Sequence, residues 1–370
     1  MEKNKGNSSR EKKIFIILKD FFTDLKELLI RNKGSFGRIF LYSLVTIIAT
    51  LPLRSDFEFV TNAVQDVWAR YYEVSSVYRA RIIGHEIFRF MVFYPSVSWY
   101  VLRVIFGINA ELLRRYLKLK RLKGKYIEIA AFSYLFSPVI FWSGTTHSRT
   151  GFYQIDAVMF LLLLISLLLL EKNEKASLLF QLFTILVKEH IALLVFAWYF
   201  LQGNQKIRDI LRGIKLSKIW IPLITAGTYL MIRLYYREIL PKTYHSNPFD
   251  AGTIYQLYMM CIGERYTPFM KNQPFWRIFL SLNIFWLFLI PLCRRQNRDI
   301  LYLFLINLMF ILTFAYIWET NKLFIMFPWV FLLFFNFFQE RKKKALTSDN
   351  SQQKSVSDDF KKNKKSSRIG

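Results

Sequence analysis

Residues 157–170 read AVMFLLLLISLLLL, a run of fourteen positions in which Ser166 is the one polar residue. Residues 303–318, LFLINLMFILTFAYIW, form a second long apolar run. A helix needs roughly 20 apolar residues to cross the ~30 Å hydrocarbon core of a bilayer. Runs of this length and composition favour membrane-spanning helices over the core of a soluble protein.

The composition of the whole chain agrees with this interpretation. Of 370 residues, 53% are hydrophobic and 18% aromatic, and they fall in long runs separated by charged segments. The runs lack the alternating pattern of a membrane barrel, so helices are expected to satisfy the backbone polar groups. We therefore predict an all-α, multi-pass transmembrane helix bundle of about ten spans. The predicted spans are 38–53, 87–107, 127–143, 155–170, 178–188, 190–202, 219–237, 275–292, 300–317 and 323–338.

Basic residues predict the orientation of the bundle. Lys and Arg number 52 against 26 Asp and Glu, a formal net charge of +26. Besides the N-terminal segment, the basic clusters are 114–125, 205–218, 293–298 and 340–344. Loops rich in Lys and Arg stay on the cytoplasmic side. We expect a multi-pass protein of the cell membrane with both termini cytoplasmic. The charge then reflects topology and attraction to membrane lipids, so no nucleic-acid partner is needed to explain it.

Three regions are expected. Residues 1–37 form a cytoplasmic amphipathic segment, because apolar residues recur at helical spacing from Ile14 to Leu28. Residues 38–338 form the transmembrane domain. Residues 339–370 form a polar, basic cytoplasmic tail that is expected to be disordered.

A charged triplet interrupts the apolar stretch 185–195: Lys188, Glu189 and His190. It separates two runs of about ten to twelve residues, too short to cross squarely, whose outer flanks are both expected to be cytoplasmic. The sequence therefore predicts a short helical hairpin with the triplet at its tip. Two interpretations stay open: the charges extend to the interface at a turn, or they line a cavity.

Two long segments, 54–86 and 238–274, are expected on the outer face. In the first, apolar residues recur at helical spacing from Val60 to Tyr71, which predicts an interfacial helix on the outer membrane surface. Asp56 precedes this helix, and Tyr78-Arg79-Ala80-Arg81 follows it.

These features occur in an order that resembles the GT-C class of polyprenyl-phosphate-sugar-dependent glycosyltransferases. The resemblance covers roughly residues 38–200. It rests on Asp56 beyond the first span, the surface helix, the YRxR segment 78–81, the TGxYxxD segment 150–156, and Lys188-Glu189. Further along, WETNK (318–322), with Glu319 and Lys322, is similar to the class. Many members pair two acids in the first loop, whereas here a phenylalanine separates Asp56 from Glu58.

The resemblance implies an integral-membrane transferase of a hexosyl or pentosyl group that acts with inversion. Such transfer needs a carboxylate to accept the proton of the acceptor hydroxyl. Asp56 or Glu58 would be this general base. Asp56 has alternative roles, as the cap of the surface helix or as a partner of Arg54.

Cations are needed to stabilise the phosphate that departs from the donor, a polyprenyl-phosphate-linked sugar. Arg79 and Arg81 are candidates because a guanidinium offers paired donors, although arginines also stand beside headgroups at the edges of spans. The further candidates for substrate or phosphate binding are His147, Arg149, Lys188, Glu189 and Lys322. His147 could equally be a solvated loop residue, and Asp156 is expected to form a structural ion pair.

No metal site and no cofactor are predicted, because the four histidines are scattered and lack ligand spacing. A divalent ion held by Asp56 and a phosphate is conceivable. Two other function classes stay open: a polysaccharide polymerase, with arginines in the 238–274 loop, and a lipid-linked-sugar transporter or flippase. The latter class usually shows internal repeats, which this chain lacks.

Overall fold

The computed structural model describes residues 33–51, 82–142, 152–201, 298–314 and 326–341, together with isolated helical positions at 16, 19, 23, 223–225, 227–231 and 234. Regular structure in this part of the chain is helical throughout, without a strand. The helices are α2 (Lys33–Thr50), α5 (Ile82–Phe93), α6 (Pro95–Leu119), α7 (Gly124–Trp142), α8 (Phe152–Lys172), α9 (Glu174–Leu201) and α15 (Arg298–Phe314), followed by a helix over 327–341.

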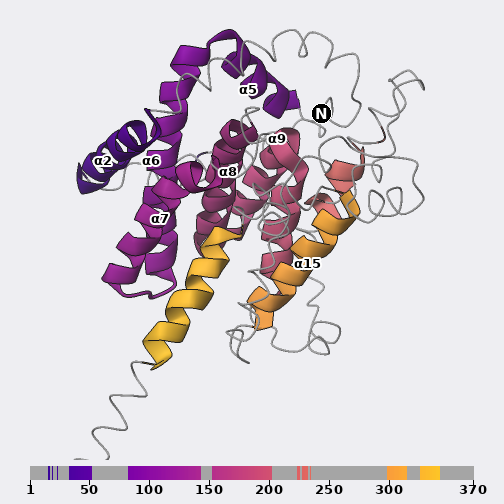
Figure 1. Ribbon diagram of the computed structural model, residues 1–370. Helices are drawn as coiled ribbons and strands as arrows, with labels where there is room; N and C mark the ends of the chain where they lie inside the picture. Colours follow the sequence, from indigo (N-terminus) through magenta and orange to yellow (C-terminus); the bar gives the residue numbers. More distant parts are fainter. Residues whose placement is uncertain are drawn as a thin grey trace, which may run out of the picture.

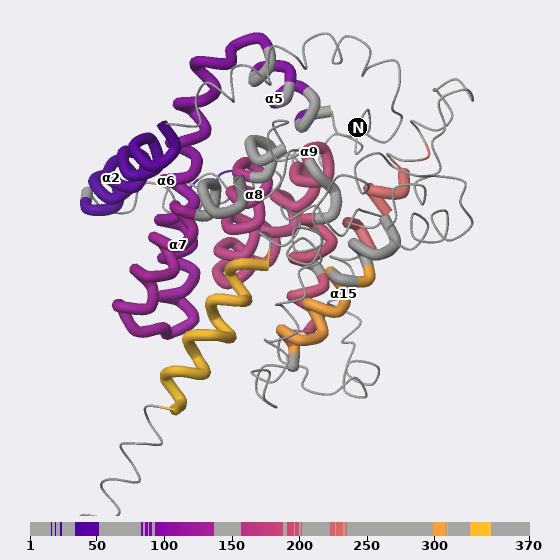
Figure 2. Tube along the Cα trace, in the orientation of Figure 1, coloured from indigo at the N-terminus to yellow at the C-terminus, as the bar shows by residue number. Residues whose placement is uncertain are grey.

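Helix α6 is central to the packing. It contacts α2, α5, α7 and α8, while α9 packs against α8 and α15. Figure 1 shows α2, α6 and α7 on one side of α8 and α9, with α15 on the other. The helix over 327–341 contacts two of these elements, because Phe335 stacks on Tyr126 of α7 and Trp329 meets Trp198 of α9. Figure 2 traces the same arrangement along the backbone.

The core between α6, α7 and α8 combines aromatic stacking with one buried amide. Tyr134 of α7 stacks on Phe160 of α8, with ring centroids 4.6 Å apart. Asn109 of α6 donates from Nδ2 to the Tyr134 hydroxyl (2.7 Å) and to the backbone carbonyl of Ala157 (2.8 Å). Polar side chains that bond across helices in this way hold apolar bundles together where the hydrophobic effect is weak.

Several predicted spans coincide with helices to within five residues at each end, namely those at 38–53, 127–143, 155–170, 300–317 and 323–338. The predicted span 87–107 is wrong in its bounds. Tyr94 separates α5 from α6, and Pro95 occupies the first turn of α6, where its fixed φ is favourable and its missing N–H has no role. Helix α6 then continues to Leu119, so Arg114 and Arg115 lie on a helix rather than in a loop.

The predicted hairpin at Lys188–His190 is also wrong. Residues 174–201 form one continuous helix of 28 residues, and the triplet lies at its midpoint. Nothing in this stretch breaks a helix, since it contains neither Gly nor Pro and Lys and Glu are good helix formers. At 1.5 Å per residue α9 is about 42 Å long, so its two ends cannot share one face of a bilayer if the helix crosses it. The prediction that 171–175 and 205–218 lie on the same side of the membrane, as the two flanks of a hairpin, therefore no longer follows.

In the part of the chain that the structure describes, one helix is long enough and apolar enough along its length to span a membrane. This is α6, with 25 residues. A shorter apolar helix covers Gly34–Thr50 within α2. The outer interfacial helix predicted at 60–71 lies outside the described residues.

Helices α2 and α6 approach closely at Gly107. A Cβ atom at this position would lie 2.7 Å from the carbonyl oxygen of Ile39 and 2.9 Å from the backbone nitrogen of Ser43, and would also meet the Ser43 hydroxyl. Backbone atoms cannot move aside as a flexible side chain can. Small residues at such crossings are typical of helix pairs in membranes.

We expect Gly107→Ala to lower the free energy of unfolding by about 1–3 kcal/mol, as overpacking of a filled interface does. On an unconstrained helix the same change would stabilise by up to about 1 kcal/mol. Gly37→Ala in α2 is the matched control, because a Cβ there meets nothing within 4 Å. Thermal unfolding in detergent measures both variants, and equal unfolding temperatures for the two would contradict the close approach.

Candidate functional site

Most residues that the sequence identifies as site candidates lie outside the described residues. These are Asp56, Glu58, Arg79, Arg81, His147, Arg149 and Lys322. Lys188 and Glu189 lie in the middle of α9, roughly 18–23 Å from the helix ends at 1.5 Å per residue. Asp156 is in the first turns of α8. Their assigned roles stay predictions.

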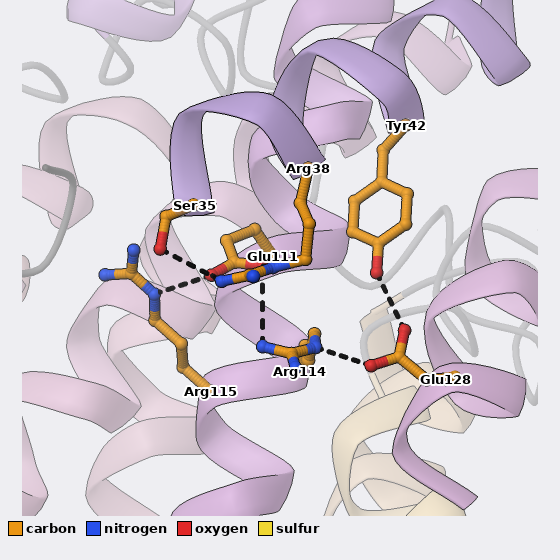
Figure 3. A network of polar contacts seen from close by, with 7 residues as sticks. All are labelled: Ser35, Arg38, Tyr42, Glu111, Arg114, Arg115 and Glu128. Carbon is orange, nitrogen blue, oxygen red and sulfur yellow. Dashed lines mark hydrogen bonds and ion pairs between the residues drawn. The ribbon is translucent and has the colours of Figure 1, made fainter. Parts of the chain in front are cut away.

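Two polar sites lie along the antiparallel contact between α2 and α6, one around Glu111 and the other around Arg103. The first is centred on Glu111 of α6, whose side chain is 1% exposed. Arg38 of α2 binds it through two hydrogen bonds, from Nε to Oε2 (2.8 Å) and from Nη2 to Oε1 (3.0 Å). Arg115, one turn along α6, donates from Nε to Oε1 (3.1 Å). Figure 3 shows these side chains converging on the carboxylate.

A second carboxylate extends this network to α7. Glu128 accepts a hydrogen bond from Nε of Arg114 (2.6 Å) and another from the hydroxyl of Tyr42 (2.9 Å). Arg114 also lies 3.9 Å from Glu111 through Nη1. The contacts therefore run from α2 through α6 to α7, as Figure 3 shows.

The sequence places these groups by helical spacing. Positions 111, 114 and 115 are i, i+3 and i+4 on α6, so their side chains share one face. Three guanidinium groups face two carboxylates, and each guanidinium forms a short ion pair. Each charged group in the network thus contacts at least one group of opposite charge, and these contacts link three helices.

The second site, around Arg103, is different in kind. Arg103 belongs to α6 and is 4% exposed, and its Nε donates to the Thr50 hydroxyl at the end of α2 (2.7 Å). Its guanidinium carbon lies 4.8 Å from the ring centroid of Trp99 and 5.9 Å from that of Phe106. The Thr50 hydroxyl in turn donates to the carbonyl of Thr46 (2.7 Å). The cation is thus enclosed by aromatic faces and one hydroxyl group.

No carboxylate pairs with Arg103 among the residues that the structure describes. A guanidinium carries five N–H donors, and the bond to Thr50 uses one of them. A buried cation without a counter-charge is strongly unfavourable in an apolar surrounding. This imbalance makes the Arg103 site the strongest functional candidate in the described part of the chain.

The sequence contains a signal for Arg103 that motif order does not capture. Between Tyr100 and Ala110 it is the single charged residue in an apolar run, VLRVIFGIN. An ionisable residue inside a membrane-spanning segment is by default a functional hypothesis. The prediction from sequence rests on cations in loops at the outer face, so it does not include Arg103.

Within the described ranges, no set of three or more His, Cys, Asp or Glu residues stands close enough to hold a metal ion. Asp56, which could help to hold a divalent ion according to the sequence analysis, lies outside those ranges. The comparisons give no further guide, because no protein-family model, curated protein or solved structure matches the chain.

Proposed function

We propose that the protein is an integral-membrane glycosyltransferase that moves a sugar from a polyprenyl-phosphate donor to an acceptor at the outer face of the membrane. The observation that carries the proposal is the position of Asp56. Asp56 comes six residues after the end of α2. The exposed side chains of α2 are mostly apolar and its buried ones are mostly polar.

The polarity of the helix faces supports residence in a membrane. On α2 the exposed side chains are Phe36, Phe40, Leu41, Leu44 and Ile48, whereas the buried ones include Ser35, Ser43, Thr46 and Thr50. The hydroxyls of Ser43, Thr46 and Thr50 are satisfied by carbonyls one turn earlier. Soluble proteins arrange residues the other way, with large apolar patches covered.

Other helices also expose apolar side chains, although their buried faces mix apolar and polar residues. Helix α6 exposes Val97, Tyr100, Val101 and Val104 and buries Ser98, Arg103, Asn109 and Glu111 beside its apolar core residues, and α15 exposes Leu305, Ile306 and Met309 while burying Asn307. Helix α8 is 21 residues long, about 31 Å, and contains the apolar run that opens at Ala157. A multi-pass bundle with apolar side chains on its outer surface and some polar side chains in its interior accounts for these patterns together.

In the proposed reaction Asp56, or Glu58 in its place, acts as general base. The acceptor hydroxyl oxygen bonds to the anomeric carbon of the sugar as the bond from that carbon to the phosphate oxygen breaks. The hydroxyl proton goes to the carboxylate, and the electron pair of the broken bond leaves with the phosphate. Attack from the face opposite the phosphate inverts the anomeric configuration.

The proposal is tested with washed membranes that contain the full chain and its native acceptors. After addition of a polyprenyl-phosphate-linked sugar labelled in the sugar, we expect the label to move into a lipid-extracted acceptor fraction and free polyprenyl phosphate to appear in equal amount. The products are quantified by scintillation counting and mass spectrometry.

Membranes that lack the protein provide the baseline for this experiment. Movement of the intact lipid-linked sugar across the bilayer without cleavage would instead identify a flippase. Transfer from an added polyprenyl-pyrophosphate-linked oligosaccharide, with release of polyprenyl pyrophosphate and no use of the monophosphate donor, would identify a polymerase. Either result would overturn the transferase proposal.

A further inference from the structure

We infer that Arg103 binds the phosphate group of a lipid where the end of α2 at Thr50 packs against α6. This inference rests on the proposed function, because it assigns the phosphate of the donor lipid to a residue that no sequence motif identified. The juxtaposition that carries it is a buried guanidinium, one hydroxyl contact and two aromatic rings.

Arg103 differs from the other two arginines in the second half of the same helix. Arg114 and Arg115 are partly exposed, and each pairs with a carboxylate at 2.6 Å and 3.1 Å, respectively. Arg103 is more deeply buried than either and has no such partner in the described part of the chain. The more deeply a charge is buried, the more it requires a counter-charge, so the partner of Arg103 must come from outside the described residues.

The donors of Arg103 and the rings beside it indicate the chemistry of that partner. The two terminal nitrogens of the guanidinium offer four N–H donors in a planar fork, which suits two oxygens of one phosphate group. Trp99 and Phe106 flank the cation and present apolar ring faces beside it. A phosphate attached to an isoprenoid chain offers oxygens to the guanidinium and apolar groups to the aromatic rings.

Asp56 and Glu58 are the carboxylates that follow α2 most closely in the sequence. They come six and eight residues after Thr50, and an extended chain spans at most about 3.5 Å per residue. Either carboxylate could therefore reach Arg103. A carboxylate paired directly with a buried guanidinium is held in its ionised form and becomes a weaker base. The general base of the proposed reaction is therefore a poor choice as the permanent partner of Arg103.

The experiment compares wild-type protein with Arg103→Gln in detergent and follows thermal unfolding. Without added lipid, Arg103→Gln is expected to unfold at a higher temperature than wild type, because the change removes an unpaired buried charge. With polyprenyl monophosphate, wild type is expected to gain stability and the variant to bind about 10- to 100-fold more weakly, the loss expected for charge-assisted hydrogen bonds. Arg103→Lys, which keeps the charge but loses the fork, should fall between the two.

Arg89→Gln is the matched control, because Arg89 is exposed on the neighbouring helix α5 and lies 3.6 Å from Glu86. Its response to the lipid should equal that of wild type. Phosphatidylglycerol and inorganic phosphate, tested separately, distinguish the source: an Arg103-dependent response to polyprenyl phosphate alone assigns the donor lipid, and one to all three assigns a general phosphate site.

A lower unfolding temperature for lipid-free Arg103→Gln, with unchanged lipid binding, would overturn the inference and indicate that contacts within the protein stabilise Arg103. The failure of the proposed function gives a different result. In that case Arg103-dependent binding of phosphate persists, but wild-type membranes transfer no sugar.

Discussion

Asp56→Asn is expected to reduce sugar transfer by about 100-fold or more, the loss typical when a positioned general base is removed. Asparagine preserves the size of the side chain and an oxygen that can cap a helix, but it accepts no proton near neutral pH. Binding of the donor lipid should persist, because the phosphate is held by cations rather than by this carboxylate. Initial rates of transfer at saturating donor, together with the donor concentration at half-maximal rate, measure the two effects separately.

Glu58→Gln is the internal control for this prediction. Two residues further along the chain, its side chain points in a different direction whether the segment is extended or helical. Full activity in Glu58→Gln together with loss in Asp56→Asn would assign the base to Asp56. The opposite pattern would move the role to Glu58, and full activity in both variants would contradict the proposed mechanism.

Helix positions could be predicted from sequence wherever one apolar run has clear polar ends. The span at 155–170 extends to Phe152–Lys172 in the structure, where Asn173 accepts hydrogen bonds from the backbone N–H groups of Lys175 and Ala176 and so starts α9. The prediction failed where charge was taken as a break. Lys188, Glu189 and His190 are compatible with helical backbone, so their charge alone does not end α9.

The polar sites were harder to predict because they depend on which helices are neighbours. Arg38 and Glu111 are 73 positions apart, and neither stands out in its own segment. Their pairing requires α2 and α6 to cross closely, which Gly107 permits. Arg103 is the exception, because a single charge in an apolar run is visible in the sequence without knowledge of the fold.

Glu111→Gln is expected to lower the free energy of unfolding by about 3 kcal/mol, since loss of one partner leaves buried charges uncompensated. Glu111 is the sole described residue that all three arginines of the network approach, at 2.8 Å for Arg38, 3.1 Å for Arg115 and 3.9 Å for Arg114. The arginines are partly exposed, so water screens some of their repulsion and the loss should fall at the lower end of the range for buried pairs.

Glu128→Gln is the matched control, because the Glu128 side chain is 41% exposed. Exposed ion pairs contribute about 0–1 kcal/mol, so this variant should unfold close to wild type. A double variant, Arg38→Met with Glu111→Leu, tests the pair itself. Apolar side chains of similar volume often replace a buried ion pair without loss, so the double variant should be more stable than Glu111→Gln alone. If Glu111→Gln and Glu128→Gln unfolded at the same temperature, the carboxylate of Glu111 would not be what fixes α2 against α6.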